Sequence, residues 1–235
     1  MSNDLMPHYP GKELEALSFA VNYHRWIIDA FEPYLGETVA EVGAGVGSVS
    51  KLLLGKRIKR LFAFEPSHNL YPFLKEELRH EGRAQAINDF FSPRYAHEGF
   101  DSIVYINVLE HIQDDRTELV QAREMLNPQG HLLVFVPALA WLYSDFDKQI
   151  GHWRRYTKGG LSGLARDVGF TLVKAQYFDL AGIIPWYINF VVLRNSIGSG
   201  NVSLYDRLMV PTMRLIERVV PPPIGKNVLL VGKKA

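Results

Sequence analysis

The sequence predicts an α/β fold, in which helices are wound on both faces of a seven-stranded, mostly parallel sheet. Three observations predict it. Short apolar runs alternate with segments of helical periodicity almost throughout residues 38–179. The glycine-rich stretch "VGAGVG" (42–47) directly follows the first apolar run. The final stretch "NVLLVGKK" (227–234) has the pattern of an edge strand, which we expect to be antiparallel to the others.

The elements follow in order along the chain. An N-terminal amphipathic helix is expected over 14–35, because apolar residues recur at three- and four-residue steps and Gly36 is suited to end it. Strands are expected over 38–42, 60–66, 84–89, 100–109, 131–138, 170–179 and 227–234. Helices are expected over 48–56, 67–82, 114–127 and 157–169. In the helix over 67–82, Ser67 is a candidate cap and Gly82 a candidate stop.

A long insertion, residues 180–225, separates the last two strands, where a simple hairpin needs about two to five residues. Its first part, "LAGIIPWYINFVVL", is shorter than the roughly 20 apolar residues that cross a bilayer. Its second part is amphipathic and is interrupted by Pro211. We therefore expect one domain over 1–235, with a helical insertion that acts as a lid, a homodimer contact or a peripheral membrane element through 180–220; the lid is favoured.

Composition excludes several classes of protein. The 235 residues carry a formal net charge of +1, so the chain lacks the basic footprint of a nucleic-acid-binding protein. There is no cysteine, which excludes disulfide frameworks and thiolate metal sites. The first residues do not have the pattern of a secretory signal, and we expect a cytoplasmic protein.

The glycines at 43, 45 and 47 indicate a bound cofactor, because glycine lets the backbone approach a ligand at the start of a helix. Two cofactor classes use such a loop. A dinucleotide-binding loop needs a glycine where Ser48 stands. In addition, Glu41 precedes the loop, and its negative charge suits an ammonium or sulfonium group better than a pyrophosphate.

This segment resembles motif I of class I S-adenosylmethionine-dependent methyltransferases, which have a Rossmann-like fold. The resemblance covers about 38–179 and the final strand, and "NVLEHI" (107–112) is similar to the ubiquinone-methyltransferase-like group. It implies that S-adenosyl-L-methionine is the cofactor and that Glu41 lies at its methionine end. The other cofactor-binding residues that it implies are Gly43, Ala44, Gly45, Gly47, Glu65, Pro66, Asp89, Phe90, Asn107 and Val108.

Within that set, Glu65 is expected to hold the ribose hydroxyls, and Asp89 with the backbone of Phe90 to hold the adenine. Two structural alternatives stay open. Glu65 is also placed to cap the following helix, and Asp89 is also suited to begin the turn "NDFFSP".

The acceptor side is expected after the fifth strand, around "GHWRRY" (151–156). His152 is the preferred base, with Tyr156 and His111 behind it. Candidate substrate-binding residues are Arg154, Arg155, Trp153 and Tyr143. The alternative is that the two arginines pair with Asp145 and Asp147 to fix a loop. These two acids supply too few ligands for a metal ion, so no metal is expected.

We thus expect a methyltransferase domain that methylates an oxygen or nitrogen of a small-molecule acceptor, which is anionic, sugar-like or lipid-linked. Few catalytic residues are needed, because alignment dominates methyl transfer. Two alternatives stay open: an NAD(P)-dependent oxidoreductase, and a non-catalytic ligand-binding protein on the same fold.

Overall fold

The computed structural model describes residues 20–194 and 199–235. It contains one seven-stranded sheet in the order β3-β2-β1-β4-β5-β7-β6. The strands are β1 Thr38–Val42, β2 Arg60–Phe64, β3 Ala84–Ile87, β4 Phe100–Ile106, β5 Leu126–Pro137, β6 Phe170–Phe178 and β7 Asn227–Lys234. β1 to β5 pair in parallel, and β7 runs antiparallel to both β5 and β6. The predicted fold class is confirmed, but β7 lies between β5 and β6 and is not the edge strand that its pattern predicted.

The strand order reverses between β1 and β4. From β1 the chain moves outward through β2 to β3, and then returns to place β4 on the other side of β1. The connections that leave these two strands therefore diverge at the carboxyl edge of the sheet. In open parallel sheets, this divergence opens the crevice in which ligands bind.

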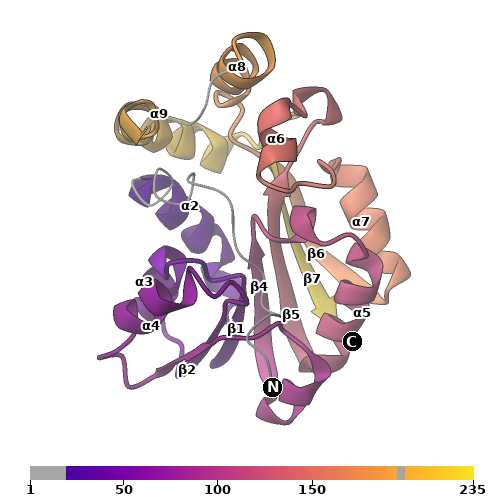
Figure 1. Cartoon of the computed structure of the whole chain (residues 1–235). Coiled ribbons are helices and arrows are strands. Elements are labelled where there is room, and N and C mark those ends of the chain that lie inside the picture. Colours follow the sequence, from indigo (N-terminus) through magenta and orange to yellow (C-terminus); the bar gives the residue numbers. More distant parts are fainter. Residues whose placement is uncertain (1–19, 195–198) are drawn as a thin grey trace.

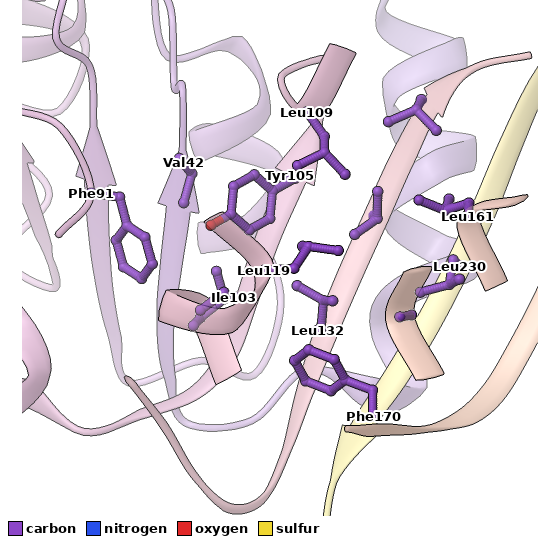
Figure 2. Packing of buried hydrophobic residues seen from close by; sticks show 14 of the residues in the cluster. Val42, Phe91, Ile103, Tyr105, Leu109, Leu119, Leu132, Leu161, Phe170 and Leu230 are labelled. Atoms are coloured by element: carbon purple, nitrogen blue, oxygen red, sulfur yellow. The ribbon is translucent and has the colours of Figure 1, made fainter. Parts of the chain in front are cut away.

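Helices cover both faces of the sheet (Figure 1). One face carries α2 Val21–Phe31, α3 Ser48–Leu54, α4 Tyr71–Glu77 and α9 Ser199–Val219. The other carries α5 Asp115–Met125 and α7 Lys158–Asp167. Each face has its own apolar core; Figure 2 shows the second, in which Leu119 of α5 and Leu161 of α7 pack toward the sheet residues Leu132 and Leu230.

Several helix ends differ from the predictions. α2 stops at Phe31 and continues as the 3-10 turn η2 Glu32–Tyr34, which contains Pro33. Gly36 serves a different purpose, because a β-carbon there would lie 2.2 Å from the Asp101 β-carbon on β4. The predicted residues 14–19 of this helix lie outside the described part of the chain.

The helix expected over 67–82 is only α4, and neither of its predicted ends is correct. Leu70 occupies the cap position, and the helix ends before Leu78. Ser67 is held instead by its backbone N–H, which donates to Glu65 Oε1.

β5 begins at Leu126 rather than at 131, and α5 ends at Met125. Leu126 pairs with Phe100 of β4, and a register shift between Phe100 and Ser102 accommodates the extra residues. The predicted strand over 100–109 ends at Ile106, because Asn107 adopts a left-handed φ of 53°. The strand over 84–89 is likewise shorter and ends at Ile87.

Short helices complete the carboxyl edge of the sheet. They are η4 Leu109–His111, η5 Ala140–Leu142 and α6 Asp145–Gln149, whereas η3 Pro93–Glu98 leads into the start of β4. The insertion forms α8 Ile183–Trp186, the π-helix η6 Tyr187–Val192 and α9. Pro211 does not interrupt α9, contrary to the prediction.

α9 remains in place because two of its carboxylates bind backbone N–H groups of other elements. Asp206 accepts from Asn22 and Tyr23 of α2 at 3.0 and 2.8 Å. Glu217 accepts from Asp179 and Leu180, just after β6, at 3.1 and 2.8 Å. None of the helices in the described ranges is both long and apolar enough to cross a membrane.

Candidate active site

A cleft opens at the carboxyl edge of the sheet, where β1 and β4 diverge. It combines the loop between β1 and α3 with the end of β4 and one side chain of α2. Its lining residues are His24, Glu41, Val42, Gly43, Ala44, Gly45, Val46, Ser48, Val49, Ile106 and Asn107. Five of the predicted cofactor-binding residues therefore lie together: Glu41, Gly43, Ala44, Gly45 and Asn107.

Glu41 is the acid at one end of this cleft, and its side chain is nearly buried, with 4% of the residue exposed. Burial raises the pKa of its carboxyl to about 8; the nearby Glu65 also raises it, and the hydrogen bond from Ser50 lowers it. His24 lines the same cleft, and burial lowers its pKa to about 4, so that it is neutral at pH 7. The cleft thus offers an acid that a bound cation would ionise.

The glycine loop is shaped by the protein residues that pack against it. Gly43 has a φ of 69°, and a β-carbon there would lie 2.5 Å from Val108 Cγ2. Val108, predicted to bind the cofactor, therefore packs on the loop that lines the cleft. Gly47, with a φ of 90°, is the N-cap of α3.

Glu65 closes the loop from the end of β2. One of its oxygens accepts from the Gly45 N–H at 2.8 Å, and the other accepts from the Ser67 N–H at 2.8 Å. Asn88 contributes a contact that the sequence did not indicate. Its amide donates to the carbonyls of Glu65 at 2.9 Å and Pro66 at 3.4 Å, and so joins the ends of β2 and β3.

Asp89 belongs to a turn of its own. Its Oδ1 accepts from the Phe90 N–H at 2.8 Å, and its Oδ2 accepts from the Tyr95 hydroxyl at 2.9 Å. Arg94 forms an ion pair with the same carboxylate. The Phe90 ring is exposed beside this turn. Asp89 therefore forms the turn that the sequence analysis kept as the alternative, and Phe90 lies at the solvent-exposed side of this turn.

On the acceptor side, the buried Asp147 organises the loop after β5. Its carboxylate accepts from His152 Nδ1 at 2.8 Å, from Arg155 Nε at 2.9 Å, and from the Ser144 N–H at 2.9 Å. Burial acts to raise the pKa of Asp147, but the His152 hydrogen bond and the Arg155 charge outweigh it and lower that pKa. Because an ionised carboxylate only accepts, His152 donates through Nδ1 and presents Nε2 as an acceptor.

Arg154 and Arg155 both form ion pairs with aspartates of the protein. The Arg155 side chain is 1% exposed in its ion pair with Asp147, and its guanidinium lies 4.7 Å from the Trp186 ring centroid. Arg154 pairs with Asp115 at 2.7 Å. For Arg155, the structure shows the loop-fixing pair that the sequence analysis kept as the alternative; for Arg154, the partner is not the expected Asp145.

The remaining predicted residues of this loop have mixed surroundings. The Tyr156 hydroxyl donates to Asp115 Oδ2 at 2.7 Å, and burial followed by this hydrogen bond raises its pKa, which makes it a poor base. The Tyr143 hydroxyl donates to the His152 carbonyl at 2.7 Å. Trp153 is 55% exposed.

Glu110 is a residue that the sequence analysis quoted in "NVLEHI" without giving it a role. It is fully buried, and burial raises the pKa of its carboxyl to about 8. Its Oε1 lies 3.8 Å from His152 Nε2, and the rings of His111 and His152 meet edge-on with centroids 4.6 Å apart. The structure thus brings His111 and His152 together around Glu110.

The reversed strand order, the glycine loop after β1 and the buried acid beside it define a class I S-adenosylmethionine-dependent methyltransferase. The residues fit this cofactor, because Glu41 supplies a carboxylate, and Gly43 and Gly45 line the cleft with backbone that carries no side chain. A family model described as a methyltransferase domain matches residues 19–175, which is more than half of the chain. The chain belongs to this family, and the match decides against the dinucleotide-dependent oxidoreductase.

Solved structures share the fold. A SAM-dependent methyltransferase from Archaeoglobus fulgidus is 16% identical, with 94% of this chain and 98% of that chain covered and a TM-score of 0.63. The cyclopropane synthase MmaA2 from Mycobacterium tuberculosis is 16% identical, with 99% and 100% covered and a TM-score of 0.60. The Burkholderia thailandensis 1,6-didemethyltoxoflavin-N1-methyltransferase is 15% identical, with 96% and 82% covered and a TM-score of 0.59. No curated protein matches the sequence.

Proposed function

We propose that the protein transfers a methyl group to an oxygen or nitrogen atom of a small-molecule acceptor. One observation carries the proposal: His152 is oriented by a buried carboxylate at Nδ1, and its Nε2 faces Glu110, three residues beyond the cleft residue Asn107. An oriented imidazole beside a cofactor cleft suits an acceptor that must lose a proton. We assign His152 as the base that accepts this proton.

When bound, S-adenosylmethionine supplies a methyl group already activated by its sulfonium. Glu41 would hold the ammonium at its methionine end, and the backbone of the glycine loop would lie along it. Glu65 would hold the ribose hydroxyls. Its two hydrogen bonds leave further lone pairs, because each carboxylate oxygen accepts about two. Asp89 and Phe90 would hold the adenine at the exposed side of their turn.

The acceptor that this loop favours is apolar rather than anionic. Arg154 and Arg155 form ion pairs with Asp115 and Asp147, so neither guanidinium group is free to bind an anionic acceptor with two hydrogen bonds. The exposed Trp153 lies next to His152 in the sequence and offers an aromatic surface. The resemblance of "NVLEHI" to ubiquinone methyltransferases supports an aromatic acceptor, and a lipid-linked one is the minority case. The near-neutral net charge supports a small molecule rather than nucleic acid, and the lack of cysteine supports a cytoplasmic protein.

We assign the first half of the 180–225 insertion to a lid over the acceptor loop. Trp186 Nε1 donates to the Leu142 carbonyl at 3.3 Å. The ring of Phe146 in α6 lies 5.8 Å from the Trp186 ring and 4.9 Å from the Phe190 ring, measured between centroids. These contacts join α8 and η6 to the loop that carries His152. A homodimer contact and a membrane-surface element are the competing roles for the second half.

Methyl transfer from labelled S-adenosylmethionine into a cell metabolite extract tests the function, with the labelled product identified by mass spectrometry. His152→Ala should lower turnover about 100-fold or more, while cofactor affinity measured by calorimetry stays unchanged. His97→Ala, which removes an exposed histidine, is the control and should change neither quantity. Equal loss of turnover and cofactor affinity in His152→Ala would indicate a structural role. If the wild-type protein transfers no label to any compound in the extract, the result would support a non-catalytic binding protein.

A further inference from the structure

Three side chains with metal-ligating atoms meet beside the cofactor cleft. One ligand atom each from Glu110, His111 and His152 lies within 4.8 Å of the others. Glu110 and His111 belong to η4 after β4, and His152 follows α6. Two imidazoles and one carboxylate are a donor set that binds zinc and related divalent ions in proteins.

The Glu110 carboxylate gives an independent reason to expect a ligand. Its side chain is 0% exposed, and within the described part of the chain neither of its oxygens has a hydrogen-bond partner. A carboxylate that is buried without partners is destabilising by several kcal/mol. A cation held between this carboxylate and the two imidazoles would remove that cost.

His152 is already oriented as a metal ligand. Its Nδ1 donates to Asp147 Oδ1 at 2.8 Å, and Nε2 therefore carries the free lone pair 3.8 Å from Glu110 Oε1. Metal-binding histidines usually donate their second ring nitrogen to a carboxylate or carbonyl in this way. On the other side, the His111 ring is hydrogen-bonded by the backbone of Ile150 and Gly151.

Distance and charge agree with a bound ion. In a tetrahedral site with metal–nitrogen bonds of about 2.0–2.1 Å, neighbouring ligand atoms lie about 3.3 Å apart. The separation of 3.8 Å between Glu110 and His152 is close to this value. Arg155 is the nearby cation, but Asp147 neutralises it in a buried ion pair, so its charge does not oppose a metal ion that would ionise Glu110.

We propose that Glu110, His111 and His152 bind one divalent transition-metal ion of the zinc class, with a coordination position open to the acceptor. Sequence reasoning expected no metal because it weighed only Asp145 and Asp147. The ion deepens the proposed function, on which its role in the reaction rests. A hydroxyl or amine bound to the ion would be more acidic and would release its proton to water. In the metal-loaded protein, His152 would then hold the ion, and this would replace the role of proton acceptor proposed above for it.

Cobalt binding tests this site directly. Metal-stripped full-length protein is titrated with Co²⁺ and followed by visible absorption, and by the melting temperature after addition of Zn²⁺. Wild type should bind one ion per chain, with the absorption of a tetrahedral or five-coordinate site. Glu110→Gln, which keeps the size of the side chain, should weaken binding at least tenfold, and His152→Ala should weaken it similarly. His97→Ala should bind as wild type does.

Cofactor binding and methyl transfer are measured on the same samples to separate the two proposals. A protein that binds no Co²⁺, or whose Glu110→Gln variant binds it as tightly as wild type, overturns the metal site. If methyl transfer also persists after chelation, the proposed function stands and His152 is the base. Metal binding that depends on Glu110, in a protein that binds no S-adenosylmethionine, supports the metal site and overturns the proposed function.

Discussion

The Ser50 hydroxyl donates a hydrogen bond of 2.5 Å to Glu41 Oε2, and so links the first turn of α3 to the last part of β1. It is the hydrogen bond that holds the Glu41 side chain in the cleft. It does not compensate for burial, because the pKa of Glu41 is still raised to about 8. Glu41 is thus a carboxyl that the folded chain keeps protonated at neutral pH until a cation binds beside it.

Replacing this acid should stabilise the cofactor-free protein. The folded pKa of Glu41, about 8, lies above the ordinary value of 4.5 for glutamate. Between these values the folded state binds more protons than the unfolded state, and stability falls as pH rises. Glu41→Gln removes this loss. The stability gap between variant and wild type should widen by up to roughly 1.4 kcal/mol per pH unit in that window. Urea unfolding at several pH values measures it. Glu37→Gln, at an exposed position, should show no such widening.

Gly43→Ala should be destabilising by about 2–4 kcal/mol, because of its positive φ and its contact with Val108. In a double-mutant cycle with Val108→Ala, part of that loss should be recovered, since the clash with the valine methyl is removed. Gly163→Ala is the matched control. It lies inside α7 with open space around it, and should be neutral or stabilising by up to about 1 kcal/mol. A cycle without coupling would show that Val108 does not constrain the loop.

Asp147→Asn should be destabilising by about 3–5 kcal/mol, because it leaves the buried Arg155 charge without its partner. Asp145→Asn, in the same short helix, is the control. Its side chain is 54% exposed in its pair with Lys148, so its effect should stay within about 0.5 kcal/mol. Thermal unfolding of both variants measures the difference. Similar values for the two would mean that the loop does not depend on the buried pair.

Sedimentation with lipid vesicles tests the role of the exposed face of α9. Apolar side chains of α9 stay exposed, including Leu208, Leu215 and Val219. Because Asp206 and Glu217 anchor α9 on α2 and on the residues after β6, we expect the protein to remain in the supernatant when it is sedimented with anionic liposomes. Pelleting that Leu215→Glu abolishes would assign the exposed face to a membrane surface. A concentration-dependent rise in mass without lipid would assign it to a dimer.

The sequence was sufficient where the signal is local. Strand and helix periods gave the order of the elements, and Glu41 stood out because an acid inside an apolar, central strand needs a reason. Helix ends were less predictable. Gly36 is required by contact with Asp101, which is close in space but distant in sequence.

The acceptor side was harder to predict because its residues meet only through folding. Glu110 and His152 follow different strands, β4 and β5, and approach one another because these strands are neighbours and the loop after α6 folds back. The Trp153 N–H donates to the Glu110 carbonyl at 2.8 Å and completes this approach. No spacing in the sequence encodes such a contact. The Arg155–Asp147 pair was foreseen only as an alternative for the same reason.

Calorimetric titration with S-adenosylmethionine tests the central claim most directly, when it is repeated at pH 7 in buffers of different ionisation enthalpy. Wild type should bind one cofactor per chain and release close to one proton, because Glu41 ionises on binding. Glu41→Gln should bind about 10- to 100-fold more weakly and release no proton. Wild type that takes up no S-adenosylmethionine, or a Glu41→Gln variant with unchanged affinity and proton release, would contradict the account.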